Sequence, residues 1–329
     1  MYSREESGIT VGENAYSEIA RVCSPYGKTA AVVGGRRAVK SAFGRLAFPN
    51  SEIKITAKIW PGSDCEYSAA EVLLDIDELK KADMLFAVGG GRSIDMGKYL
   101  GGVLKKPVFS FPTVMSCAAA VTPRCYMYRN GQSSAEYTAA PAHAFFDSRL
   151  LADADEKYLK RGVCRALAAA ADGVFYSDMC DMSSKLALAR LEICREALLE
   201  CGRQALLDNR RHVVSEAFEK AVYAAGAFGA GIGSGLASCL SDKLSAFLNK
   251  DAASIAVLAA LLYCGEADEY MREKRFFESI GVPTRMREYN ISDETAKRLA
   301  EKLSDSEISE NHLIKISGLR LGAIFNMIK

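Results

Sequence analysis

The chain of 329 residues lacks the features that mark several protein classes. It carries 42 Lys and Arg against 41 Asp and Glu, so no charge excess points to nucleic acid or to an acidic membrane. No apolar run approaches the roughly 20 residues needed to span a bilayer. Residues 1–6 are polar and lack the apolar stretch of a signal peptide. These absences predict a cytoplasmic globular protein with no nucleic-acid or membrane partner.

Histidine is scarce, and the cysteines are unpaired along the sequence. The histidines are His143, His212 and His312, and the ten cysteines contain no CxxC pair. The sequence therefore suggests neither a zinc ribbon nor a thioredoxin-like site, and each cysteine is interpreted as a small buried hydrophobe.

Proline nearly vanishes in the second half, where only Pro283 follows Pro141. Long Ala- and Leu-rich stretches there predict helices over 165–179, 185–206 and 213–229. The first half instead predicts a helix over 69–81 and strands over 29–33, 53–60, 84–88 and 107–111. Apolar strands separated by helices indicate a parallel sheet covered on both faces. The predicted fold is an α/β domain over residues 1–150 followed by an all-helical domain over 151–329.

A glycine-rich turn follows the predicted strand 84–88. Gly89, Gly90 and Gly91 let the backbone approach a ligand with no Cβ in the way, and a helix expected to begin near Ser93 adds the positive end of its dipole. Ser93 is predicted to cap that helix or to bind a phosphate, and Asp95 to lie in its first turn. A turn without a ligand explains consecutive glycines less well, because they cost backbone entropy without a packing gain. The turn therefore predicts a site for a pyrophosphate-bearing dinucleotide.

A second glycine cluster, which runs from Gly226 to Gly235, follows no strand and does not fit the G-x-G-x-x-G spacing. Close helix packing or a helix break is the better interpretation.

Three blocks of sequence resemble the iron-containing alcohol dehydrogenase family, in particular its glycerol dehydrogenase branch. Residues 86–95 followed by Lys98 match the family's GGG-K/R-S/T-x-D-x-x-K loop. Residues 107–116 match its strand that ends in P-T-x-x-S, and residues 141–162 align with the stretch that leads into its helical domain. The resemblance implies an N-terminal Rossmann-like domain, a C-terminal helical domain and an active site in the cleft between them.

The resemblance also implies roles for single residues. It gives the pyrophosphate to Gly89, Gly90, Gly91 and Ser93, with Asp95 and Lys98 supporting the loop. Thr113 and Ser116 would lie against the adenine and ribose, and Thr122, Arg124 and Tyr128 against the nicotinamide half. Arg124 departs from the family, where an apolar residue is usual.

The cofactor is expected to be NAD or NADP, and the residues after the first predicted strand favour NADP(H). NAD-using relatives place an Asp there for the ribose hydroxyls, whereas this chain has Gly35, Arg36 and Arg37. A glycine leaves room for a 2′-phosphate, and a guanidinium can pair with it in bidentate fashion. The alternative is that Arg36 and Arg37 form a solvated helix start.

The metal site that the resemblance implies is altered at every ligand. The family holds iron or zinc with one Asp and two His, which polarises the substrate's hydroxyl. Here Arg165, Ser241 and Asn249 stand at those positions, and no histidine lies between His212 and His312. Cys164, Cys239, Asp242 and Asp251 are an alternative ligand set, but a guanidinium beside a divalent cation is strongly repulsive. We therefore expect no metal, and we expect Arg165 to pair with Asp251 or Asp242.

Two functions stay open on this basis. The first is an NAD(P)-dependent oxidoreductase for a small alcohol, polyol or aldehyde, without the usual metal. Its candidate catalytic residues are Arg165, Tyr128 and Asp251, and its candidate proton donors are Tyr128, Arg124 and Lys98. The second is a catalytically degenerate dinucleotide-binding protein with a sensing or partner role. A dehydroquinate-synthase-like lyase is disfavoured because it also needs the missing metal. The expected partners are a small-molecule substrate and further copies of the chain in a homo-oligomer.

Overall fold

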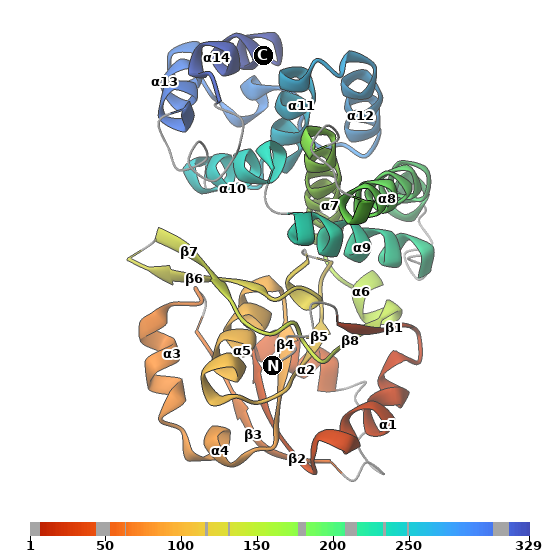
Figure 1. Cartoon of the computed structure of the whole chain (residues 1–329), viewed down its shortest axis with the longest axis vertical. Coiled ribbons are helices and arrows are strands. Elements are labelled where there is room, and N and C mark those ends of the chain that lie inside the picture. The colour runs from red at the N-terminus through yellow and green to blue at the C-terminus, as the bar shows by residue number, and fades with distance from the viewer. Residues whose placement is uncertain are drawn as a thin grey trace. The chain divides into compact units, whose positions relative to one another are not determined.

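A computed structural model describes residues 7–43, 53–62, 64–115, 118–130, 132–176, 182–207, 216–232, 235–248, 250–304 and 316–329. The chain divides into two compact units (Figure 1). One comprises residues 1–159 and 210–223, and the other residues 160–209 and 224–329. The predicted boundary after residue 150 stays a prediction. No helix among the described residues is long and apolar enough to cross a membrane.

The first unit contains a six-stranded sheet in which every neighbouring pair of strands is parallel (Figure 1). This confirms the predicted α/β class. In spatial order the strands are β1 (Gly8–Gly12), β8 (His143–Asp147), β5 (Val108–Pro112), β4 (Met84–Gly89), β2 (Thr29–Gly34) and β3 (Lys54–Ile59). An antiparallel hairpin of β6 (Arg124–Arg129) and β7 (Gln132–Tyr137) forms a second sheet. Strands β1, β8, β6 and β7 were absent from the sequence prediction.

The helices of this unit cover the sheet and connect its strands. They are α1 (Ile19–Cys23), α2 (Arg36–Phe43), α3 (Tyr67–Leu74), α4 (Asp77–Lys81), α5 (Gly91–Leu104) and α6 (Ser148–Ala152), with short 3₁₀ turns at Ala15–Glu18, Ser24–Tyr26 and Ala118–Ala120. The single helix expected over 69–81 is wrong. Ile76 takes an extended conformation with ψ of 118°, which ends α3 and makes Ile76 the N-cap of a separate helix, α4.

Strand β4 is the centre of the core because every residue in it is buried. Phe86 packs with Phe109 and Phe111, and Phe111 stacks on Phe145 with ring centroids 5.1 Å apart. Side chains alternate between the faces of a strand, so Ala87 faces the other way. A Cβ added at Gly97 of α5 would lie 2.5 Å from the Ala87 Cβ, so this glycine lets α5 lie directly on β4.

The second unit is helical, as predicted. Its helices are α7 (Glu156–Tyr176), α8 (Met182–Leu207), α9 (Glu216–Ile232), α10 (Leu236–Leu248), α11 (Ala253–Cys264), α12 (Ala267–Ser279), α13 (Asp293–Ser304) and α14 (Gly318–Met327), with a 3₁₀ turn at Met286–Tyr289. Helices α7 and α9 begin in residues assigned to the first unit. Helix α11 is buried along nearly its whole length and packs against α10, α12 and α14. An apolar helix of this kind forms the centre of a helical core.

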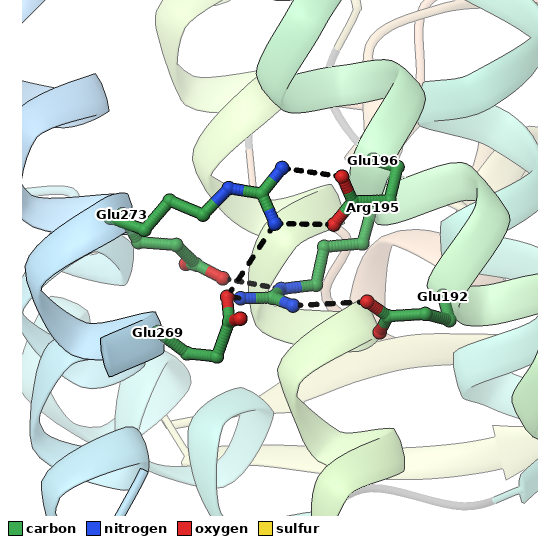
Figure 2. Close-up of polar contacts among 6 residues, drawn as sticks. Glu192, Arg195, Glu196, Glu269 and Glu273 are labelled. Carbon is green, nitrogen blue, oxygen red and sulfur yellow. Dashed lines mark hydrogen bonds and ion pairs between the residues drawn. The ribbon is translucent and has the colours of Figure 1, made fainter. Parts of the chain in front are cut away.

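Buried charges join α8 to α12 in this unit (Figure 2). The Arg195 side chain is 2% exposed, and its Nε donates to Oε1 of the fully buried Glu273 at 2.7 Å. Arg195 also pairs with Glu269 and Glu192. Because three carboxylates surround one guanidinium, the buried cation is compensated on several sides.

Candidate functional site

The candidate dinucleotide site lies where the parallel strands end. Strand β2 leads through α2 to β3 on one side, whereas β4 leads through α5 to β5 on the other. Residue Gly34 pairs in register with Val88, so the segment after β2 lies beside the turn after β4. In open parallel sheets, ligands bind at such a switch point, outside the carboxyl ends of the strands. The Gly34–Gly35 segment and the Gly89–Gly91 turn therefore meet at this switch point.

The turn at Gly89 requires glycine. Its φ of +142° is a conformation that residues with a Cβ rarely adopt, and an added Cβ would lie 3.0 Å from the Ser93 side chain. Gly90 is the N-cap of α5, and the helix begins at Gly91. The prediction that Ser93 caps the helix is wrong, because Ser93 is already the third helical residue. Backbone N–H groups of a helix's first turn can bind a phosphate group.

The two glycines after β2 differ in the space around them. A Cβ at Gly34 would lie 2.4 Å from the Val88 carbonyl oxygen, so Gly34 allows close approach of two strands. A Cβ at Gly35 would meet nothing nearer than Ser93 Oγ at 4.0 Å. Gly35 therefore lies next to the phosphate turn with open space beside it, and Arg36 and Arg37, which follow it, are both exposed.

Asp95 and Lys98 anchor the hairpin to α5. The expected first-turn position of Asp95 is wrong, because the first turn of α5 has no acidic residue. Asp95 Oδ1 lies 2.9 Å from Lys98 Nζ, and both side chains are buried. Asp95 Oδ2 accepts from the Tyr126 amide at 3.3 Å, while Lys98 Nζ donates to the carbonyl of Thr122 at 3.2 Å and to that of Arg124. Burial raises the pKa of Asp95, and Lys98 opposes that shift.

These contacts bring several predicted residues together beside the glycine turn. Thr122 is buried, and Arg124 lies over the Tyr126 ring with its Cζ 4.8 Å from the centroid. Arg92 of α5 lies over the Tyr128 ring at 5.7 Å. The Thr113 amide donates to the Gly89 carbonyl at 3.1 Å. Ser116, predicted to touch the adenine or ribose, lies outside the described residues.

In the helical unit, Arg165 forms the ion pairs predicted for it. Its Nε lies 3.2 Å from Asp251 Oδ2, and its Nη1 lies 3.8 Å from Asp242 Oδ1. Arg161, one helical turn earlier, also contacts Asp251 Oδ2 through its Nε at 2.6 Å. The side chains of Arg165 and Asp251 are 23% and 24% exposed, so the pair is half-buried. Asp251 therefore accepts from two guanidinium groups.

The residues at the other two expected ligand positions add no further charge. Ser241 is buried, and its Oγ has no hydrogen-bond partner among the described residues. Asn249 lies outside the described residues, as do His212 and His312. His143 is committed to the sheet of the first unit, where its Nε2 lies 2.7 Å from Thr10 Oγ1.

The alternative ligand set of Cys164, Cys239, Asp242 and Asp251 does not form. Within the described part of the chain, no three or more His, Cys, Asp or Glu side chains come together in a way that could hold a metal ion. Burial, with Asp251 adding to it, raises the pKa of the Cys164 thiol well above its usual range.

Comparison with known proteins identifies the fold. A family model described as iron-containing alcohol dehydrogenase matches residues 10–154. A glycerol dehydrogenase of Thermotoga maritima is 26% identical over 323 residues, which covers 89% of this chain and 87% of that protein. The chain is therefore similar in sequence to the iron-containing alcohol dehydrogenase family.

Solved structures of the iron-containing alcohol dehydrogenase family share the fold of the whole chain. A probable glycerol dehydrogenase from Sinorhizobium meliloti has a TM-score of 0.83 at 19% identity, covering 98% of this chain and 96% of that one. Glycerol dehydrogenase from Schizosaccharomyces pombe has a TM-score of 0.82 at 18% identity, covering 98% and 89%. The predicted resemblance, including its glycerol dehydrogenase-like branch, is confirmed.

Two contacts of the predicted site residues Arg165 and Arg36 were absent from the sequence prediction. Arg161 lies four residues before Arg165 on α7, and that helical spacing was the available signal. The stacking of Arg36 on Trp60, with Cζ 5.1 Å from the ring centroid, had no signal in the sequence, because 23 intervening residues separate the two side chains.

Proposed function

We propose that this chain is a nicotinamide-dinucleotide-dependent oxidoreductase for a small alcohol, polyol or aldehyde, that it works without a divalent metal, and that it prefers NADP(H). The observation that carries the proposal is the pairing of Arg165 with Asp251 and Asp242 at the family's metal-ligand position, in a chain whose glycine turn is intact. The proposal extends to self-association as a homo-oligomer.

The first unit supplies the cofactor-binding residues in this proposal. The Gly89–Gly91 turn and the first turn of α5 hold the pyrophosphate, with Ser93 beside them. Thr113 borders the adenosine half, and Thr122, Arg124 and Tyr128 border the nicotinamide half. The bound dinucleotide would supply or accept the hydride. Lys98 is excluded as a proton donor to substrate because it is buried and committed to Asp95 and two backbone carbonyls.

The absence of a metal rests on the donors present. A divalent cation needs neutral or anionic donors, and Arg165 places a permanent positive charge among them. Asp251 and Asp242 are both engaged by that charge. We assign to Arg165 the role of a fixed cation that binds and orients the substrate's oxygen. It is a weaker electrophile than a metal, so turnover is expected to be slow compared with metal-dependent relatives.

A second candidate function is a catalytically degenerate dinucleotide-binding protein that senses the cofactor or binds a partner. The two carboxylates that flank Arg165, Asp251 and Asp242, favour it, because a guanidinium neutralised in this way contributes less to an electrophilic site.

One experiment separates these functions. The purified protein is dialysed, its metal content is measured, and oxidation of NADPH and NADH is followed over a panel of small aldehydes and ketones with and without EDTA. We expect turnover that is unaffected by EDTA. Arg165→Gln is expected to abolish turnover with unchanged cofactor affinity, while the matched control Arg161→Gln keeps turnover.

The other outcomes are also decisive. A stoichiometric amount of zinc or iron that survives dialysis, or turnover lost in EDTA, contradicts the metal-free mechanism. Cofactor binding with no turnover on any substrate supports the sensing function instead.

A further inference from the structure

Trp60 is the single tryptophan of the chain, and it is 54% exposed at the end of β3. Arg36, the first residue of α2, lies over its indole with Cζ 5.1 Å from the ring centroid. A guanidinium on the face of an indole is attracted by the ring quadrupole, and Trp is the strongest such partner among the aromatic side chains. The exposed Trp60 ring thus restricts the flexible Arg36 side chain, whose guanidinium stays on the face of the indole.

This position is continuous with the glycine turn. Val33 pairs in register with Ile59, so Trp60 lies at the same sheet edge as the end of β2. Gly34 pairs with Val88, so the opposite side of β2 adjoins Gly89. Gly35 bridges the two, since its open Cβ position lies 4.0 Å from Ser93 Oγ. An adenosine whose pyrophosphate occupies the turn would extend past Gly35 towards Arg36.

The charge at this position is positive. Helix α2 begins with Arg36 and Arg37, and its first turn carries no acidic side chain. The N-terminal end of a helix carries a partial positive charge from its N–H groups, and at α2 this charge adds to that of the two arginines. A phosphate monoester is the ligand group that this chemistry selects, because a guanidinium fork matches its geometry and charge.

We propose that Trp60 is a positioning residue that holds Arg36 in place for the 2′-phosphate of NADP(H), so that the Arg36–Trp60 stack sets the cofactor preference. The inference rests on the proposed function, because it names the groups that select the cofactor. It deepens that function by giving a role to Trp60.

The fluorescence of Trp60 can report ligand binding at this position, because Trp60 is the single tryptophan of the chain. Adenosine 2′,5′-bisphosphate and adenosine 5′-phosphate are titrated into the full chain while that emission is followed. The two differ by the 2′-phosphate alone. We expect the bisphosphate to change the emission at an about tenfold lower concentration, the effect of one charge-assisted pair. Equal concentrations for both nucleotides, or no change with either, would overturn the inference.

Variants then separate the positioning role of Trp60 from the charge of Arg36. The Kd values for NADPH and NADH are measured by nicotinamide fluorescence. Arg36→Gln is expected to weaken NADPH binding about tenfold. Trp60→Ala is expected to weaken it about three- to fivefold, and Trp60→Phe, which keeps an aromatic face, to restore most of the affinity. The matched control Arg37→Gln removes the same charge one residue away and is expected to change the NADPH Kd by less than about twofold. NADH affinity is expected to stay unchanged in all four.

The contrary outcomes are distinguishable. An unchanged NADPH Kd in Trp60→Ala, an equal loss for NADH, or an equal loss in Arg37→Gln would overturn the role of the stack. Tighter binding of NADH than of NADPH by the unaltered protein would overturn the preference and leave the oxidoreductase proposal standing. Failure to bind either nucleotide would refute the proposed function itself.

Discussion

Two regions of the molecule differ in what forms them. The glycine edge of the α/β unit is formed by backbone, and the Arg165 cluster of the helical unit is formed by charged side chains. The edge is shaped by missing side chains, with Gly34, Gly35 and Gly89 leaving room where a Cβ would collide or would fill space. The cluster is made from charged side chains, Arg165 and Asp251 among them. One site is defined by backbone and the other by side chains.

This difference predicts that the two regions respond differently to substitution. A backbone site persists as long as the strand, turn and helix form, because its ligand contacts are N–H groups and a helix dipole. A side-chain site changes with single substitutions while the fold remains intact. A related contrast occurs within each unit. Arg195 and Gly34 support the fold, whereas Arg165 and Gly35 are the matching residues that we assign to ligand binding.

The largest expected effect tests this contrast in the helical unit. Arg195→Met leaves the fully buried Glu273 without its Arg195 partner, and it is expected to lower the free energy of unfolding by about 3–5 kcal/mol. Arg165→Met is the matched control. It removes a half-exposed pair, so the expected cost is below about 1 kcal/mol. Urea denaturation measures both, and similar losses would show that Arg165 is a structural residue.

A smaller effect tests the same contrast in the α/β unit, with neighbouring glycines. Gly34→Ala places a Cβ 2.4 Å from the Val88 carbonyl oxygen. We expect this overpacking to cost about 1–3 kcal/mol of the free energy of unfolding. Gly35→Ala meets nothing closer than 4.0 Å and is expected to be neutral within about 0.5 kcal/mol. Thermal and urea unfolding of the two variants check this, and equal stability would contradict the assignment of Gly34 to packing and Gly35 to ligand space.

An effect of a different kind, a pH dependence, is expected at Asp172 in the helical unit. Burial raises the pKa of Asp172 from 3.8 to about 7, opposed by the hydrogen bonds from Ser238 and from neighbouring backbone amides. The unfolded chain loses this proton near 3.8, whereas the folded chain keeps it to about 7. Stability from this group is therefore present at low pH and is lost as the pH rises towards 7, by up to about 1.4 kcal/mol per pH unit.

Asp172→Asn removes that titration while keeping the size of the side chain. Urea unfolding of both proteins between about pH 5 and pH 8 measures the difference in slope, and the difference is expected to level off above the folded pKa. Parallel curves for the two proteins would show that Asp172 does not titrate in this range. The comparison between proteins also cancels Glu273, whose pKa burial raises to about 7 as well, in opposition to Arg195.

The sequence predicted features with a local signal. Strand β4 is a continuous apolar run followed by three glycines, so both the strand and the turn could be identified from neighbouring residues. The hairpin β6–β7 was missed although Cys125 and Met127 are buried in alternation and Asn130-Gly131 is a turn dipeptide. Strand β1 was missed for another reason. It pairs with β8 more than 130 residues later, and its own five residues carry no apolar run.

Among the charged pairs, one could be predicted from the sequence and another could not. The pairing of Arg165 with Asp251 or Asp242 was predicted from a charge that replaces a ligand, and both contacts form. The Arg195 network could not be predicted, because Glu273 lies 78 residues away and an arginine on a helix is usually exposed. Burial of a long charged side chain depends on tertiary packing, which a local pattern does not contain.

The Asp95–Lys98 pair has a consequence for the order in which the chain is made. Lys98 Nζ donates to carbonyls 24 and 26 residues downstream, so its acceptors leave the ribosome after α5 has done so. A nascent chain that ends before Thr122 carries a lysine and an aspartate on the face of α5 that will later be buried. Water must solvate both until β6 arrives, and its arrival completes the hydrogen bonds of this pair.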